Sequence, residues 1–153
     1  KGDSASGSRF NLLPPLIDKA LEQPIIGSGF GTPVTYKTLD ARALVTNPDG
    51  NFTTYSFEWA YLDMITEMGF IGLAVILALF VIVLKTLWQR FRSAPEDQVL
   101  SRALLIGSFF SLLFLLFTHA TTPYISHPLG MGLFIMVTLI AVNYDRSTAE
   151  THN

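Results

Sequence analysis

A nearly continuous apolar segment covers residues 68–88 and reads MGFIGLAVILALFVIVLKTLW. Its first part, residues 68–84, contains no Asp, Glu, Lys or Arg. A helix needs about 20 mostly apolar residues to cross the hydrocarbon core of a bilayer, and about 17 is the working minimum. Lys85 can extend its ammonium group to the interface, where Trp88 is also favourable. The segment therefore predicts a first transmembrane helix.

A second and longer uncharged run covers residues 103–144. One helix of that length would measure about 60 Å, roughly twice the thickness of the hydrocarbon core. Residues 119–128, HATTPYISHP, supply a break, because two prolines and small polar residues end one helix and begin the next. The run predicts two further spans, at about 102–121 and 128–144. The alternative is a buried hairpin in a soluble all-α protein, since helices that are apolar all round lie either in a core or in lipid.

The composition excludes several classes of protein. Half of the 153 residues are hydrophobic, 14% are charged, and the formal net charge is −2. This balance excludes a disordered or collagen-like chain, and it provides no basic field that would attract nucleic acid. The chain has no cysteine, which excludes a disulfide framework, a thiolate metal site and a cysteine nucleophile.

Basic residues predict the topology of the spans. The connection between the first two spans carries more basic than acidic side chains: Lys85, Arg90, Arg92 and Arg102 against Glu96 and Asp97. The positive-inside rule places this connection in the cytoplasm. Residues 1–67, with five basic and eight acidic side chains, then lie outside, and residues 145–153 form a cytoplasmic tail. The predicted fold is an all-α, integral membrane helical bundle fragment with three transmembrane helices (residues 68–144) and an N-terminal extracytoplasmic helical loop.

The start of the chain suggests that it continues a longer protein. Residue 1 is lysine, and the first residues, KGDSASGS, lack the apolar region of a signal peptide. An outer segment as long as residues 1–67 ordinarily follows another span that delivers it across the membrane. We therefore expect further transmembrane helices upstream.

The outer segment is expected to form two helices joined by a loop. Prolines at the first turn and an apolar stripe predict a helix over residues 15–23. Residues 34–52 are expected to be irregular, with a turn at residues 47–50, NPDG. From about Thr54 the pattern is helical again and continues into the first span. Gly69 and Gly72 allow that helix to bend or to pack closely against a neighbour.

Residues 25–33, IIGSGFGTP, carry three glycines at alternate positions. Such a stretch allows tight turning and close backbone approach, and two interpretations stay open. It is a phosphate cradle or a plain turn, but its spacing is neither G-x-G-x-x-G nor a Walker A motif.

Acidic and aromatic residues gather before the first span. Glu58, Asp63 and Glu67 are interleaved with the aromatic side chains of Phe57, Trp59 and Tyr61. One interpretation is an interfacial anchor of the aromatic-belt kind. The other is a functional site, because Glu58 precedes the expected span by ten residues, far enough from the hydrocarbon to stay ionised.

The order of four short motifs resembles the C-terminal half of the O-antigen ligase and O-antigen polymerase family. The motifs are SR at residues 8–9, QPIIGSGFG at 23–31, EWAYL at 58–62 and TEMGFIG at 66–72. The resemblance covers residues 8–88 by motif and the two later spans by order. It implies a multi-pass protein of the bacterial inner membrane that transfers a glycan from undecaprenyl diphosphate. The implied acceptor is a hydroxyl group of a glycan or of lipid A core on the periplasmic face, and no metal or other cofactor is implied.

The resemblance assigns two site residues. Arg9 matches the arginine that opens the family's periplasmic loop, and Glu58 falls where the family has a catalytic histidine. Glu58-Trp59 stands in place of the usual His-Asn, which indicates a changed base, a different acceptor or a branch that has lost transfer. A carboxylate can receive the proton of an attacking hydroxyl in inverting glycoside chemistry. A guanidinium can stabilise a departing diphosphate through paired hydrogen bonds.

Other polar residues belong to the expected outer side. Lys19, Lys37 and Arg42 are further cations that could contact phosphate, and their order of importance is open. His119 and His127 flank the expected turn between the last two spans, but their spacing is not that of metal ligands. A second functional hypothesis is a non-catalytic membrane protein whose outer segment binds envelope glycan or anchors an assembly.

Overall fold

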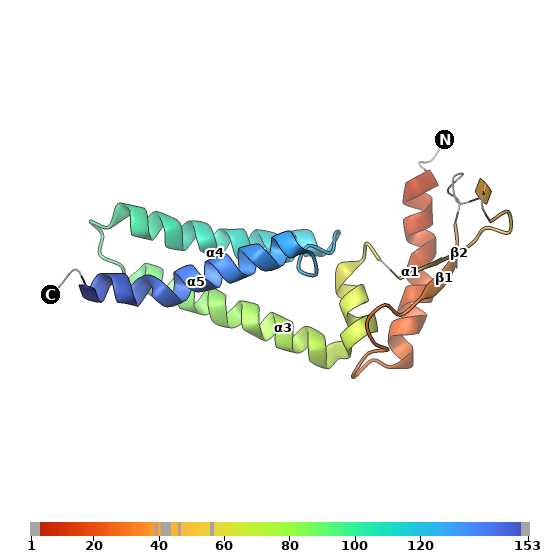
Figure 1. Ribbon diagram of the computed structural model, residues 1–153, viewed down its shortest axis with the longest axis horizontal. Helices are drawn as coiled ribbons and strands as arrows, with labels where there is room; N and C mark the ends of the chain where they lie inside the picture. The colour runs from red at the N-terminus through yellow and green to blue at the C-terminus, as the bar shows by residue number, and fades with distance from the viewer. Residues whose placement is uncertain (1–3, 39, 41–43, 46, 56, 151–153) are drawn as a thin grey trace. The chain divides into compact units, whose positions relative to one another are not determined.

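A computed structural model describes residues 4–38, 40, 44–45, 47–55 and 57–150, and for residues 4–9 and 145–150 it describes the backbone only. The elements are α1 (Ser4–Glu22), β1 (Val34–Lys37), β2 (Asn51–Thr54), α3 (Ala60–Ser93), α4 (Val99–His119) and α5 (Pro128–Glu150) (Figure 1). This part of the chain is mainly helical, which confirms the predicted class. It divides into two compact units, residues 1–75 with 121–123 and residues 76–120 with 124–153.

In the first unit, α1 is longer than predicted. It begins at Ser4 instead of near Pro15 and contains both Pro14 and Pro15. Leu12, Leu16 and Ala20, spaced four residues apart, are all buried on one face of the helix. The prediction of a start at Pro15 was wrong because this buried face extends across the prolines, and its packing outweighs the helix hydrogen bonds that proline cannot make.

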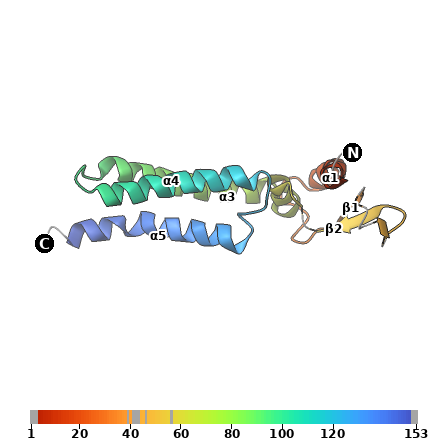
Figure 2. The same cartoon turned by 90° about the horizontal axis from the view of Figure 1, so that it is seen from above.

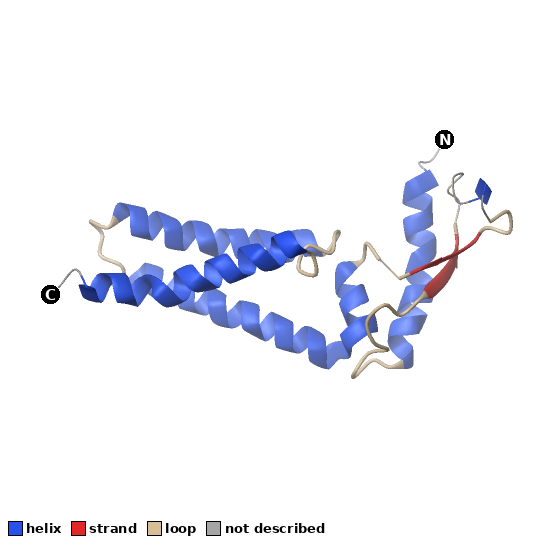
Figure 3. Ribbon diagram, viewed as in Figure 1, coloured by secondary structure: helices blue, strands red, loops and turns tan. Residues whose placement is uncertain are grey.

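A two-stranded antiparallel ladder forms where irregular chain was expected. Val34 of β1 is opposite Thr54 of β2, and Lys37 is opposite Asn51. The predicted turn at 47–50 lies between the strands and is closed by a 2.9 Å hydrogen bond from the Gly50 N–H to the Asn47 carbonyl. Figure 3 shows both strands in red. The ladder also corrects the predicted helix start at Thr54, since α3 begins only at Ala60.

The helix α3 is not continuous. Gly69 has φ 66° and ψ −174°, a conformation outside the helical region, and it divides the element into residues 60–68 and 70–93. The bend is visible in the yellow-green part of α3 (Figure 1). The expectation of one unbroken helix entering the first span was therefore wrong, although the position of the bend agrees with the expected role of Gly69.

The second unit contains the part of α3 from residue 76 onward together with α4 and α5, which follow one another with short connections (Figure 2). The α3 helix contacts α4 through Trp88 and Phe109, whose ring centroids are 5.6 Å apart. It contacts α5 through Phe80 and Phe134, at 4.5 Å. The helix α5 begins at Pro128, as predicted, but continues to Glu150, so most of the expected tail is helical.

Within the described residues, α3 and α4 are the two helices long and apolar enough to cross a membrane. The uncharged part of α5, Pro128–Tyr144, is a shorter apolar helix. Only 17% of the most apolar window of α3 and 22% of that of α4 are buried inside the structure. The core helix of a soluble protein would be mostly buried, so these faces favour a membrane or further apolar partners over the buried-hairpin alternative.

Replacing Leu16 tests the core of the first unit. Leu16 is fully buried among Leu12, Val34 and Phe57, so Leu16→Ala should destabilise this unit by about 2–5 kcal/mol. Thermal unfolding of the full-length protein in detergent measures the effect. The neighbouring Ile17 is 39% exposed, and Ile17→Ala should cost much less. Equal costs for the two variants would contradict the described face of α1.

Candidate functional site

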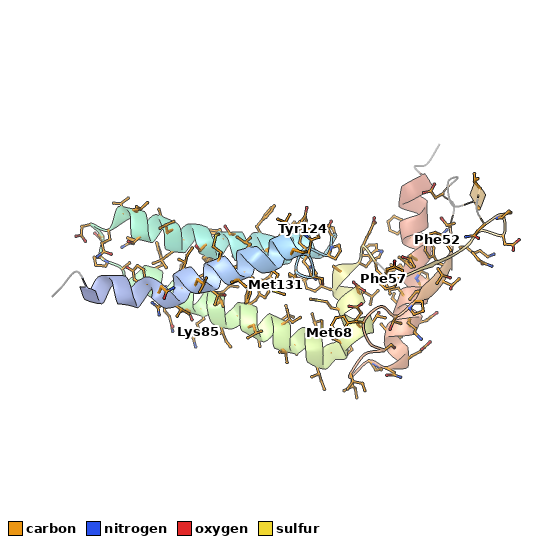
Figure 4. The ribbon with its side chains drawn as sticks, in the orientation of Figure 1. Phe52, Phe57, Met68, Lys85, Tyr124 and Met131 are labelled. Carbon is orange, nitrogen blue, oxygen red and sulfur yellow. The ribbon has the colours of Figure 1, made fainter. Side chains whose placement is uncertain are left out.

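The core of the first unit fixes the segment that carries Glu58. Phe57 is 1% exposed and packs with Leu12 and Leu16 of α1 and with Val34 of β1. Figure 4 labels Phe57 between α1 and the start of α3. Because Phe57 is anchored in this way, the backbone that follows it is held against the helix and the ladder.

Glu58 is exposed and lies in the bend that precedes α3, not on a helix as the sequence had indicated. Trp59, the next residue, packs against the core, and its ring centroid is 6.4 Å from that of Phe10. Burial raises the pKa of Tyr36 on β1, and the charges of Asp40 and Glu58 raise it further, whereas a hydrogen bond with Thr38 opposes them. The carboxylate of Glu58 is therefore part of the electrostatic surroundings of β1.

Arg9 lies in α1, but its side chain is outside the described part of the chain. Phe10 follows Arg9, and Trp59 follows Glu58, so the contact between these two rings brings together the segments that carry the two predicted site residues. The pairing of Arg9 with the same substrate as Glu58 stays a prediction.

The other cations named in the first part of the chain have different surroundings. Lys19 forms an ion pair with Glu22 at 2.6 Å, within the last turns of α1. The Lys37 ammonium donates to the Asp49 carbonyl at 2.8 Å, across the ladder. Arg42 lies outside the described residues.

The glycine-rich turn docks onto the break in α3. The N–H groups of Ser28 and Gly29 donate to the carbonyls of Thr66 and Glu67, at 2.7 and 3.0 Å. Two N–H groups at the start of the second half of α3 donate in the opposite direction, to carbonyls of the turn. The Phe70 N–H donates to the Pro24 carbonyl at 2.8 Å, and the Ile71 N–H donates to the Ile25 carbonyl at 3.2 Å. We call residues 24–31 and 66–71 together the clasp.

The clasp satisfies the groups that a broken helix exposes. A helix end leaves carbonyls without donors, and a helix start leaves N–H groups without acceptors. Here the turn supplies donors to the first half of α3 and acceptors to the second half. The side chain of Glu67 adds a fifth bond, because its Oε1 accepts the Gly31 N–H at 3.0 Å. The break is therefore a hydrogen-bonded junction.

Two glycines allow this close approach. A Cβ atom on Gly69 would overlap the Ile25 carbonyl, and one on Gly27 would overlap the backbone of Glu67. Both residues also have positive φ, which favours glycine. The turn uses its N–H groups at residues 28, 29 and 31 on α3, so in this structure they do not form a phosphate cradle. The docked turn resolves the two interpretations left open by the sequence.

Asp63 is a titratable group that the sequence did not single out as a site. It lies on the half of α3 before the break, one helical turn from Glu67. Within the described residues its Oδ1 is buried without a hydrogen-bond partner. Burial, and then the charge of Glu67, raise the pKa of Asp63 to about 7. The spacing of four residues between two acids was the available signal, because such pairs share a helix face.

His119 and His127 stabilise the turn between α4 and α5 through hydrogen bonds. His119 is fully buried, and its Nδ1 accepts the Ile125 N–H at 3.1 Å. His127 caps α5, since its Nδ1 accepts the Leu129 N–H at 3.3 Å and its carbonyl accepts the Met131 N–H. Both residues thus have structural roles in a polar turn.

Metal-ligand clusters and comparisons with known proteins were two further ways in which residues of this site could be assigned. Among the described residues no group of three or more His, Asp or Glu side chains is placed to hold a metal ion. No protein-family model, curated protein or solved structure matches the chain. The site is therefore defined by its own geometry: the two halves of the clasp flank the 57–59 segment in sequence, and α1 packs against Phe57 and Trp59.

Alanine substitutions test the clasp. Gly27→Ala and Gly69→Ala should undock the turn, because each new Cβ overlaps backbone atoms. Hydrogen exchange at the amides of Ser28 and Phe70 should then accelerate. Gly29→Ala is the matched control, since Gly29 has φ +97° but open space where a Cβ atom would lie.

Gly29→Ala measures the cost of backbone strain alone, because an alanine at positive φ is strained but its Cβ meets no other atom; this strain costs about 1–3 kcal/mol. We expect the two clasp variants to lose more stability than Gly29→Ala by about 1–3 kcal/mol, the usual cost of overpacking. Equal losses and unchanged exchange in all three variants would contradict the clasp.

The raised pKa of Asp63 predicts a pH dependence of stability. The folded state holds the Asp63 proton up to about pH 7, whereas the unfolded chain releases it near 3.8. Stability from this group is therefore greatest at acid pH and is lost as the pH rises from about 4 to 7. Asp63→Asn should flatten the fall in Tm between about pH 4 and pH 7.

The exposed Asp18 of α1 provides the control, and Asp18→Asn should leave the wild-type pH profile in place. A profile unchanged by Asp63→Asn would show that Asp63 does not titrate in this range.

Proposed function

We propose that the chain belongs to a membrane glycosyltransferase of the O-antigen ligase or polymerase type. The protein transfers a glycan from undecaprenyl diphosphate to a hydroxyl group of a glycan or lipid A core acceptor, on the periplasmic face of the bacterial inner membrane. The chemistry requires no metal in this proposal.

The clasp is the observation that carries the proposal. The glycine-rich turn and the TEMGFIG sequence at residues 66–72 are two of the four motifs whose order carries the resemblance, and they are far apart in the sequence. Gly31 and Glu67, 36 residues apart, are nevertheless hydrogen-bonded. Their docking gives a physical reason why both motifs occur in one chain, at this spacing from the first span.

The proposed membrane arrangement has three spans. The second half of α3 and α4 have the necessary length and apolar character. Residues 128–144 of α5 carry no Asp, Glu, Lys or Arg, and their number is about the working minimum for a span. The basic connection between α3 and α4 is cytoplasmic, and residues 1–67 are periplasmic.

Glu58 and Arg9 share the proposed chemistry. The acceptor hydroxyl oxygen attacks the anomeric carbon, and the bond from that carbon to the diphosphate oxygen breaks. Its electron pair leaves with undecaprenyl diphosphate, and the hydroxyl proton moves to the exposed carboxylate of Glu58. The guanidinium of Arg9 stabilises the charge on the departing diphosphate.

One observation favours a second function. Glu58-Trp59 replaces the His-Asn pair expected from the resemblance, and a branch without transfer activity would keep its glycan-binding surface. In that case the protein binds envelope glycan or anchors an assembly. Glycan binding without any transfer from the lipid carrier distinguishes this function from the first.

Substitution of Glu58 and Arg9 in the full-length protein tests the proposal. Glu58→Gln should lower glycan transfer about 10²–10⁴-fold, the usual contribution of a general base. Arg9→Ala should also lower transfer, because the leaving group loses its charge partner. Glu22→Gln, at an exposed acid in α1, is the matched control, and membrane insertion should be normal in every variant.

Near-native transfer in both variants would overturn the site assignment. If Asp63→Asn abolished transfer while Glu58→Gln did not, Asp63 would be the base instead.

A further inference from the structure

A shallow groove runs between α1 and the β1–β2 ladder. Its helical side is formed by Phe10, Asn11, Pro14 and Pro15, and its other side by residues of both strands. All of the lining belongs to the first unit. The groove combines aromatic rings, proline rings, amides and an ammonium group, a mixture unlike the apolar packing of a core.

The prolines change the hydrogen-bonding capacity of this helical surface. In a helix the N–H of each residue donates to the carbonyl four residues earlier. Pro14 and Pro15 have no N–H, so the carbonyls of Phe10 and Asn11 do not receive these donors. Both residues line the groove. These two carbonyls therefore lack the donors that a regular helix would give them.

The ladder supplies further polar groups in fixed positions. The Asn11 side-chain amide donates to the Lys37 carbonyl at 3.1 Å, which ties α1 to β1. The Lys37 ammonium is held by the Asp49 carbonyl at 2.8 Å. Asn51 is exposed on β2 and also lines the groove. Its amide provides a donor and an acceptor opposite the helix.

Aromatic rings complete the groove. Phe10 is 64% exposed, although its ring also contacts Trp59. Tyr36 is held by an edge contact with Phe52, with centroids 5.9 Å apart. A pyranose has an apolar C–H face that packs on such rings and a rim of hydroxyl groups that need hydrogen bonds. The groove offers both, whereas a lipid chain would need a continuous apolar lining.

We propose that this groove binds the saccharide chain of the acceptor, an inference that rests on the proposed function. Phe10 contacts the Trp59 ring of the Glu58 segment, and Tyr36 packs on the same core cluster as Trp59. Glu58 takes its proton from the acceptor, so the neighbouring surface holds acceptor sugar. The carbonyls freed by the prolines and the Asn51 amide bind its hydroxyl groups, and Phe10 packs on a ring face.

Oligosaccharide binding tests the groove independently of turnover. The probes are maltohexaose and chitohexaose, added to the full-length protein in nanodiscs on the Glu58→Gln background. Saturation-transfer NMR and calorimetry measure binding. We expect at least one probe to bind, and Phe10→Ala to weaken it about tenfold through loss of the packing surface. Tyr55→Ala is the matched control, because Tyr55 is 72% exposed and is not part of the groove lining.

A second variant separates binding from folding. Pro14→Ala with Pro15→Ala restores N–H donors to the two carbonyls, so it should raise Tm and yet weaken binding about fivefold or more. Pro33→Ala, in the loop before β1, should leave binding unchanged.

Three results would overturn the groove assignment: no binding of either probe, binding unchanged by Phe10→Ala, or binding unchanged by the double proline variant. If the unmodified protein still transfers glycan when any of these is found, the groove assignment fails and the proposed function stands. If the unmodified protein transfers no glycan from the lipid carrier, the proposed function itself is wrong.

Discussion

Everything in the first unit depends on the backbone junction at Gly69. A helix that breaks exposes carbonyl and N–H groups, and each group that is buried without a partner is costly. The turn at residues 24–29 pairs with four of them, and the turn can do so only because Gly27 and Gly69 have no side chains. The start of the second half of α3 is therefore fixed by a turn that lies far earlier in the sequence. The segment that carries Glu58 lies between these two contact points.

The features that could be predicted from the sequence are those that depend on local residues. The uncharged runs identified α3 and α4, and the proline at residue 128 identified the start of α5. The turn at residues 47–50 followed from its own residues. Each of these features depends on neighbours within a few positions, so the sequence pattern was sufficient.

The missed features depend on distant partners. The helix α1 continues through Pro14 because Leu12 and Leu16 pack on Phe57, which is remote from them in the sequence. The short strands have no strong pattern and are stable only as a pair. For the site, the roles of Glu58 and Arg9 came from the resemblance, whereas the contact of their neighbours Phe10 and Trp59 required a fold. The environment of Asp63 likewise depends on burial, which its spacing from Glu67 does not reveal.

The clasp also closes a long loop within the first unit. Residues 32–65 leave the junction and return to it, so they form an excursion whose two ends are fixed together. Closing a longer loop is inexpensive, since doubling its length adds only about 0.6 kcal/mol. The length of this excursion, above all at the exposed residues 47–49, can therefore vary without disturbing the junction at Gly69. Variation in the length or sequence of residues 32–65 is thereby separated from the contacts that fix the break in α3.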